Sequence, residues 1–135
     1  METWIIERAQ RAITEMLVQQ FERRPYSRVA ITSAGRADEP RLSVVAHGLA
    51  DPHEIPPTEP LERCGITVSL TTAAEREDRG MQALLEVVSF LHDADVTAED
   101  LVILDCAFRM ARLERDPAQE RSRCLADFTL TLLRD

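Results

Sequence analysis

Residues 122–133 carry the clearest pattern in the chain, a two-residue alternation of apolar and polar positions. The even positions are apolar: Cys124, Ala126, Phe128, Leu130 and Leu132. The odd positions between them are mostly polar, such as Asp127 and Thr129. Because successive side chains of a strand point to opposite faces, the alternation predicts a strand that buries one face in a core and leaves the other mostly polar.

Four other segments have the composition of strands: residues 27–33, 41–49, 61–73 and 102–114. The third repeats the alternation, with an apolar face made of Cys64, Ile66, Val68 and Leu70. In the fourth, the positions expected to face the core are Val102, Leu104, Cys106, Phe108 and Met110. Asp116–Pro117 is a turn signal, so residues 115–121 are predicted to form the hairpin loop before the last strand.

Two segments have the 3.6-residue spacing of amphipathic helices. The first covers residues 2–22, and Pro25 opposes its continuation. The second covers residues 79–92, with an apolar stripe made of Met81, Leu84, Leu85, Val88 and Leu91. Thr97 and Asp100 resemble a capping box, which predicts a single helical turn after the second helix.

The order of these elements predicts the fold class. It reads α-β-β-β-α-β-β, and the short loops between the first three strands and between the last two imply antiparallel pairing. The proline-rich segment 51–60 is excluded from the sheet and is expected to be an extended connection or a protruding loop. We therefore expect one α+β domain over residues 1–135, an antiparallel sheet of about five strands covered by two amphipathic helices.

Charge and hydropathy indicate which classes of partner the chain is not expected to bind. The formal net charge is −8, which argues against a nucleic-acid partner because phosphate binding needs a basic surface. All 16 basic residues are Arg, the cation best suited to bidentate pairing with carboxylates. No apolar run approaches the ~20 residues that span a bilayer, so no membrane contact is expected.

The chain has no catalytic signature. Cys64, Cys106 and Cys124 are widely spaced and in phase with apolar strand positions, which favours small buried hydrophobes over a disulfide or metal role. His47, Asp51 and His53 are of zinc-ligand and acid–base types, but their spacing matches no compact metal motif, which favours surface-loop histidines. We expect no enzymatic activity, no cofactor and no metal.

Charged residues of both signs gather in three predicted loops or turns. Their candidate members are Arg36, Asp38 and Glu39, then Glu75, Arg76 and Asp78, then Arg115, Asp116, Glu120 and Arg121. One interpretation is that these are solvated turns. The other is that they form ion pairs between copies of the chain, where repeated pairs set register more than affinity.

The order of elements resembles the phage tail terminator family, also called tail completion or minor tail proteins. The segments that carry the resemblance are LERCGITVSLTTAAERED, MQALLEVVSFLHDA and FRMARLERDPAQERSRCLADFTLTLL. The resemblance spans nearly the whole chain, and the final hairpin is its strongest part. It lies in order and pattern, not in invariant residues, so no functional residue is carried over. The proline-rich segment departs from the family pattern.

The resemblance implies a virion structural protein without catalytic chemistry. Such proteins form a ring, usually of six copies, at the head-proximal end of the tail tube. The ring ends tube polymerisation and presents a face to the head-completion or neck protein, as a closed heterologous assembly. Assembly takes place in the host cytoplasm, and the only nucleic-acid contact expected is DNA passing through the ring.

A second class shares much of this layout. Type III secretion chaperones are also small, acidic and α-β-β-β-α-β-β in order, and they bind an unfolded effector segment as homodimers. They normally finish with a third helix, whereas the strand pattern here continues through Leu133. This difference favours the tail terminator.

Overall fold

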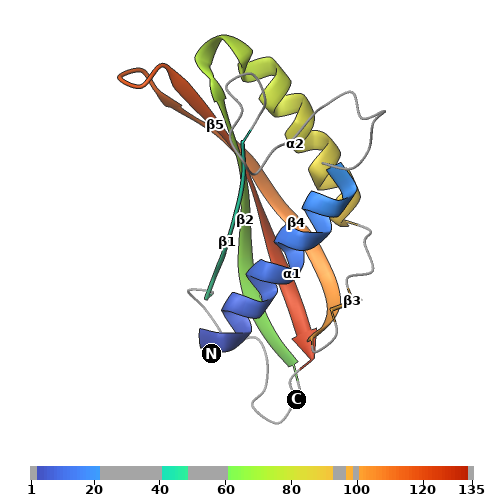
Figure 1. Ribbon diagram of the computed structural model, residues 1–135. Helices are drawn as coiled ribbons and strands as arrows, with labels where there is room; N and C mark the ends of the chain where they lie inside the picture. Colours follow the sequence, from blue (N-terminus) through green and yellow to red (C-terminus); the bar gives the residue numbers. More distant parts are fainter. Residues whose placement is uncertain (1–2, 22–40, 49–60, 93–96, 99–100, 134–135) are drawn as a thin grey trace.

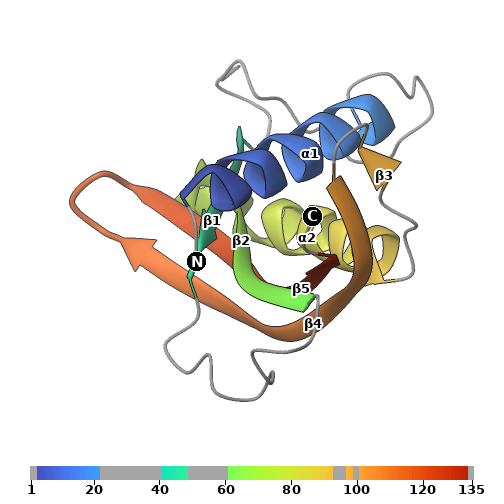
Figure 2. The same cartoon turned by 90° about the horizontal axis from the view of Figure 1, so that it is seen from below.

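The computed structural model describes residues 3–21, 41–48, 61–92, 97–98 and 101–133 of the 135-residue chain. Its helical elements are α1 (Thr3–Phe21), the short 3-10 turn η2 (Ala74–Arg76) and α2 (Glu77–His92). Its strands are β1 (Arg41–His47), β2 (Leu61–Ala73), β3 (Thr97–Ala98), β4 (Leu101–Asp116) and β5 (Arg121–Leu133). Both helices lie on one side of the sheet, which curves around them (Figures 1 and 2).

The strands form one antiparallel sheet in the order β1-β2-β5-β4-β3. The last strand of the chain, β5, lies between β2 and β4 and pairs with both along its length. The connection from β2 to β4 therefore passes through α2 and crosses over β5. This places β5 at the centre of the sheet, where one face packs on the helices.

The α+β class and the antiparallel sheet agree with the sequence prediction. β2 has the predicted bounds, 61–73, and β5 begins one residue before the predicted 122. The order of the described elements differs, because it reads α-β-β-α-β-β-β. The strand predicted at residues 27–33 and the proline-rich segment 51–60 lie outside the described residues.

The helical turn predicted after the second helix is wrong. Thr97 and Ala98 form strand β3, in which Thr97 pairs with Val102 and Ala98 pairs with Leu101. Pairing with β4 supplies backbone hydrogen bonds that a single helical turn would otherwise have to make. The capping pattern is a local preference, and this tertiary pairing overrides it.

The predicted inward phase of β4 is also wrong for part of its length. Val102, Leu104 and Met110 are 46%, 54% and 53% exposed, whereas Ile103 and Cys106 are buried. The register of β4 against β5 shifts twice, between Ile103 and Asp105 and between Phe108 and Met110. Each bulge adds one residue to β4, and each added residue exchanges the two faces of the strand.

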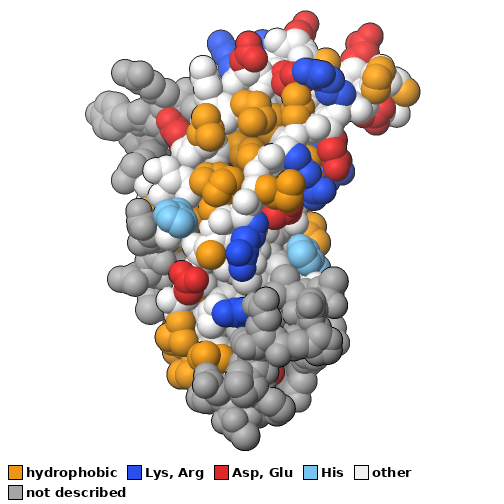
Figure 3. All heavy atoms as spheres, turned by 180° about the vertical axis from the view of Figure 1, so that it is seen from behind, with side chains coloured by type: hydrophobic (Ala, Val, Ile, Leu, Met, Phe, Trp, Pro, Cys, Tyr) orange, Lys and Arg blue, Asp and Glu red, His pale blue; other side chains and the backbone are white. Residues whose placement is uncertain are grey.

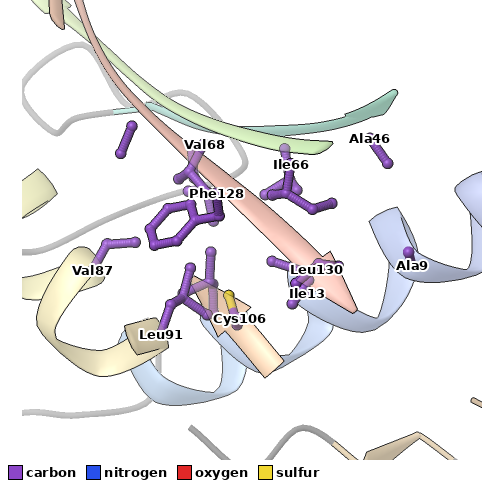
Figure 4. Close-up of a cluster of buried hydrophobic side chains, with 14 of the residues drawn as sticks. Ala9, Ile13, Ala46, Ile66, Val68, Val87, Leu91, Cys106, Phe128 and Leu130 are labelled. Carbon is purple, nitrogen blue, oxygen red and sulfur yellow. The ribbon is translucent and has the colours of Figure 1, made fainter. Parts of the chain in front are cut away.

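The core lies between the helices and one face of the sheet. Phe128 of β5 is at its centre and meets the ring of Phe108 edge to face, with ring centroids 5.7 Å apart. Ile13 of α1 and Leu91 of α2 belong to the same cluster (Figure 4). The even positions of β5 singled out by the sequence all belong to this core.

The three cysteines are free and buried, which confirms their interpretation as small core residues. Burial raises the pKa of Cys64 to about 11, that of Cys106 to about 12 and that of Cys124 to about 11. Thiols with such pKa values stay protonated near neutral pH and are poor nucleophiles.

Gly80 marks a close approach of α2 to the sheet. A Cβ at this position would lie 2.9 Å from Cγ2 of Thr72 and 3.0 Å from Sγ of Cys124. In an exposed helix, replacing glycine by alanine stabilises by up to about 1 kcal/mol. Here we expect Gly80→Ala to destabilise by about 1–2 kcal/mol, because it overpacks the contact. Urea unfolding followed by circular dichroism measures the change.

Thr72→Ser provides the control for this prediction, since it removes Cγ2, the atom nearest to the added methyl group. It should recover part of the stability lost in Gly80→Ala. A Gly80→Ala variant as stable as the parent would contradict the close packing of α2 on β2 and β5.

Candidate functional site

The β4–β5 hairpin extends beyond the helices and ends in a projecting tip (Figures 1 and 2). All residues from Glu114 to Arg121 are exposed. The predicted loop at 115–121 is too long, because β4 continues to Asp116 and β5 begins at Arg121. The turn closes with Glu120 at a φ of 52° and its amide donating to the carbonyl of Pro117 at 3.3 Å.

The start of α2 lies against this hairpin. The amide of Ala74 in η2 donates to the carbonyl of Glu120 at 2.9 Å. In the sheet, Ala73 is the register partner of Arg121, which in turn is the partner of Asp116. Two charged segments that are far apart in the sequence therefore form one end of the molecule.

One carboxylate joins the two segments. Oε1 of Glu77 accepts from Nη2 of Arg115 at 2.8 Å, and Oε2 accepts from Nε of Arg115 at 3.0 Å. Oε2 also accepts from the hydroxyl of Ser122 at 2.7 Å. We call these three residues the Glu77 clamp. It ties the first turn of α2 to both strands of the hairpin.

The clamp perturbs the ionisation of Glu77. The Glu77 side chain is 20% exposed, whereas that of Arg115 is 68% exposed. Hydrogen bonds from Arg115 and Ser122 lower the pKa of Glu77 from 4.5 to about 2, against the opposing effect of its partial burial. The hydrogen bond to Glu77 raises the pKa of Arg115. The pair is therefore fully ionised across the physiological pH range.

Most of the candidate interface residues come together at this end. Glu75 and Asp78 are exposed on η2 and α2, and Asp116, Glu120 and Arg121 are exposed on the hairpin. Arg76 is partly buried and engaged by a neighbour. Arg115 is held within the same chain by Glu77. The remaining candidates, Arg36, Asp38 and Glu39, lie outside the described residues.

Sequence reasoning missed two members of the clamp, Glu77 and Ser122. Glu77 stands within the charged run Glu75–Arg79, so composition marks the segment but does not distinguish this carboxylate from its neighbours. What distinguishes Glu77 is its position in the first turn of α2, where it faces Arg115, a residue of β4 that comes 38 positions later in the chain. With Arg115 and Arg76 engaged, the exposed charges of this end are mainly carboxylates.

Of the three residues considered for zinc or acid–base chemistry, His47 alone lies within the described residues. Nε2 of His47 lies 3.3 Å from the Thr67 hydroxyl, while Asp51 and His53 fall outside the described residues. In the part of the chain that the structure describes, no three His, Cys, Asp or Glu side chains cluster as metal ligands. None of the described helices is long and apolar enough to cross a membrane.

Comparison with known proteins gives a match at the level of structure. No known protein family matches the sequence, and no curated protein matches it. The fold is similar to that of a chain in the solved virion of a native gene transfer agent (GTA) particle, with a TM-score of 0.68 and 17% sequence identity. The match covers 92% of this chain and 93% of that chain. The two chains therefore share the whole fold.

Proposed function

We propose that the chain is a virion structural protein, a tail terminator that forms a ring of six copies at the head-proximal end of the tail tube. The observation that carries this proposal is the reciprocal fold match to a virion chain. Because the match covers nearly all of both chains, a single virion chain has the same fold as the domain described here. The order of elements in the sequence supports the same assignment.

The two edges of the sheet offer surfaces through which copies of the chain can associate in a ring. Among the described residues, no strand pairs with the outer edge of β1, or with β4 beyond Val102. Open edges present unpaired amide and carbonyl groups that a neighbouring chain can satisfy. In a closed ring, one edge of each copy contacts a different surface of the next copy, so no edge is left over.

The projecting hairpin supports a second contact. Its tip carries Asp116, Glu120 and Arg121 away from the body of the domain, and the Glu77 clamp holds its base. A stiff projection reaches a neighbour at a lower entropic cost than a free loop. The charged end would meet the next copy, the tube protein or the head-completion protein.

The mechanism we propose is occlusion. The ring binds the growing end of the tube and covers the surface to which another tube subunit would add. Its opposite face then binds the head-completion or neck protein. The protein is assembled in the host cytoplasm and remains in the virion at the head-proximal end of the tail. No cofactor and no covalent step are needed.

Native mass spectrometry and negative-stain microscopy of the purified protein test the assembly. We expect sixfold rings, or monomers that become rings when purified tube protein is added. In the same mixture, substoichiometric protein should shorten the tubes. A stable dimer that leaves tube length unchanged would contradict the proposal and favour the secretion-chaperone alternative.

A pair of charge reversals sharpens this test. Asp116→Arg with Glu120→Arg alters the hairpin tip, and Glu7→Arg with Glu15→Arg makes the same charge change on the exposed side of α1. We expect the first pair to abolish ring formation or tube shortening and the second pair to leave both intact. Equal effects of the two pairs would argue against a role for the hairpin.

A further inference from the structure

Among the described residues, no helix or strand covers the face of the sheet opposite α1 and α2 (Figure 3). Its residues follow from the register, because cross-strand partners share a face. Four transverse rows cross β1, β2, β5 and β4: His47, Gly65, Thr129 and Ala107; Val45, Thr67, Asp127 and Met110; Ser43, Ser69, Leu125 and Arg112; Arg41, Thr71, Arg123 and Glu114. We call these rows, with the bulge residue Arg109, the open face.

Arg109 joins this face through the second bulge of β4. Its Nε donates to the hydroxyl of Thr129 at 2.9 Å, and Thr129 belongs to the first row. The register shift between Phe108 and Met110 thus adds one arginine to the open face. Figure 3 shows arginine side chains spaced along this side of the molecule, with hydrophobic and acidic side chains among them.

The open face reverses the charge of the chain. It carries Arg41, Arg109, Arg112 and Arg123 against the two carboxylates Asp127 and Glu114, a formal charge of 4 − 2 = +2. The chain as a whole carries −8, so the remaining residues carry −8 − 2 = −10. The surface left uncovered by the helices is therefore the one suited to an anionic partner.

The arginine heads are tethered along the sheet by the two carboxylates. Nε of Arg112 lies 3.6 Å from Oδ2 of Asp127, and Nη1 of Arg123 lies 3.7 Å from Oε2 of Glu114. Oδ1 of Asp127 accepts from the Thr67 hydroxyl at 2.7 Å, which fixes the carboxylate. Pairs this exposed are weak, so an incoming anion can exchange for either carboxylate.

The other side chains of the face favour phosphate over a protein partner. Serine and threonine hydroxyls contact phosphates alongside arginine. Ser43, Thr67 and Thr71 offer such groups in three of the four rows, whereas Ser69 and Thr129 are buried. The exposed apolar members, Val45 and Met110, are separated by Thr67 and Asp127. No Phe, Tyr or Trp stands in the four rows, although Trp and Tyr are prominent among the anchors of protein interfaces.

We propose that the open face contacts the phosphate backbone of duplex DNA through Arg109, Arg112 and Arg123. The inference rests on the proposed function only for the source of the DNA, which would pass through the ring. A net charge of +2 spread over the outer face of the curved sheet gives weak contacts without base readout, which suits DNA that moves along the surface. Because the contacts are electrostatic, binding must weaken steeply with salt.

Fluorescence anisotropy with a short labelled DNA duplex and the purified full chain tests this surface. We expect weak binding near 50 mM salt that is lost near about 200 mM. Arg109→Gln with Arg123→Gln should reduce the slope of log affinity against log salt by about 2. The matched control, Arg11→Gln with Arg79→Gln on the helices, should leave the slope unchanged.

A substitution that should strengthen DNA binding provides a stricter test of the proposal. Glu114→Gln removes the carboxylate beside Arg123 and should increase DNA affinity severalfold, a gain that a purely structural role would not produce. The proposal is overturned if the parent chain does not bind DNA at low salt. Equal losses from the open-face and helix pairs also overturn it.

Oligomeric state separates this proposal from the proposed function. If Arg109→Gln with Arg123→Gln breaks a ring that the parent forms, the open face is a protein interface and the DNA proposal is wrong. If the parent forms no ring but binds DNA with the expected dependence on these arginines, the ring proposal fails and the DNA surface stands.

Discussion

Phe128→Ala is expected to lower the free energy of unfolding by about 3–5 kcal/mol, the largest effect of any single substitution proposed for this chain. Phe128 is 2% exposed at the centre of the middle strand. Its register partners are Ile66 of β2 and Phe108 of β4, so its removal opens a cavity between both neighbouring strands and the helices. A domain of this size is stable by only about 5–15 kcal/mol.

Urea unfolding followed by circular dichroism measures this loss. Met110→Ala is the matched control, because Met110 lies two residues along β4 from Phe108 but is 53% exposed. We expect it to change stability by no more than about 0.5 kcal/mol. A loss below about 1 kcal/mol for Phe128→Ala would contradict its place at the centre of the core.

The partner ring allows a more specific test. Phe108 and Phe128 meet at an interplanar angle of 64°, an edge-to-face contact. A double-mutant cycle with Phe108→Ala should give a coupling energy of about 0.5–1.5 kcal/mol beyond the cost of lost burial. Additive losses would mean that the two rings do not stabilise each other.

Glu77→Gln is expected to remove a component of stability that depends on pH and to loosen the hairpin. The pKa of Glu77 is about 2 in the folded chain and 4.5 when unperturbed. A lowered folded-state pKa stabilises the fold above the unperturbed value, and this stability is lost as the pH falls from about 4.5 to 2. Glutamine cannot ionise, so the variant should lack this component.

Chemical unfolding of both proteins at several pH values isolates the effect of the clamp. The parent should lose its advantage over Glu77→Gln as the pH approaches 2, because protonated Glu77 also lacks a charge. Glu75→Gln is the control, since Glu75 is exposed and lies outside the clamp. A parent whose advantage over Glu77→Gln is constant across this range would contradict the lowered pKa.

Hydrogen exchange tests the role of the clamp in positioning the hairpin. In Glu77→Gln, the amides of residues 114–116 and 118–121 should exchange about tenfold faster, while those of Phe128 and Leu130 should stay protected. Under the proposed function, the same variant should form rings less readily. Unchanged exchange at the hairpin tip would mean that strand pairing alone holds it.

The long elements follow from local periodicity. The bounds of β2, the start of β5, the positions of the two helices and the burial of the cysteines agree with the sequence patterns. The apolar stripe predicted for α2 is wrong at Leu85, which is 60% exposed, because the buried side of the helix runs through Ala83, Leu84 and Val87 instead. These features depend only on which positions are apolar within a short stretch of the sequence. Burial of an apolar stripe is favourable whatever it packs against, so the pattern predicts which side of a helix or strand faces the core.

The failures of prediction occur where a partner strand decides the outcome. β3 forms because Thr97 and Ala98 pair with β4, and the faces of β4 exchange because its register against β5 shifts twice. Neither event leaves a periodic signal in the residues concerned. The sequence marked the charged turns as candidate contacts but could not identify the pairing of Glu77 with Arg115.

The sequence by itself determined the two helices, the strands β1, β2, β4 and β5, and the buried face of β5, but not strand β3. Only the tertiary structure decided that β5 lies between β2 and β4, that the charged turns meet at one end, and that arginines gather on the open face. The physical reason is that the side of an element that becomes buried depends on the spacing of apolar residues close together in the sequence. Strand register and ion pairing are set by groups that come together only when the chain folds.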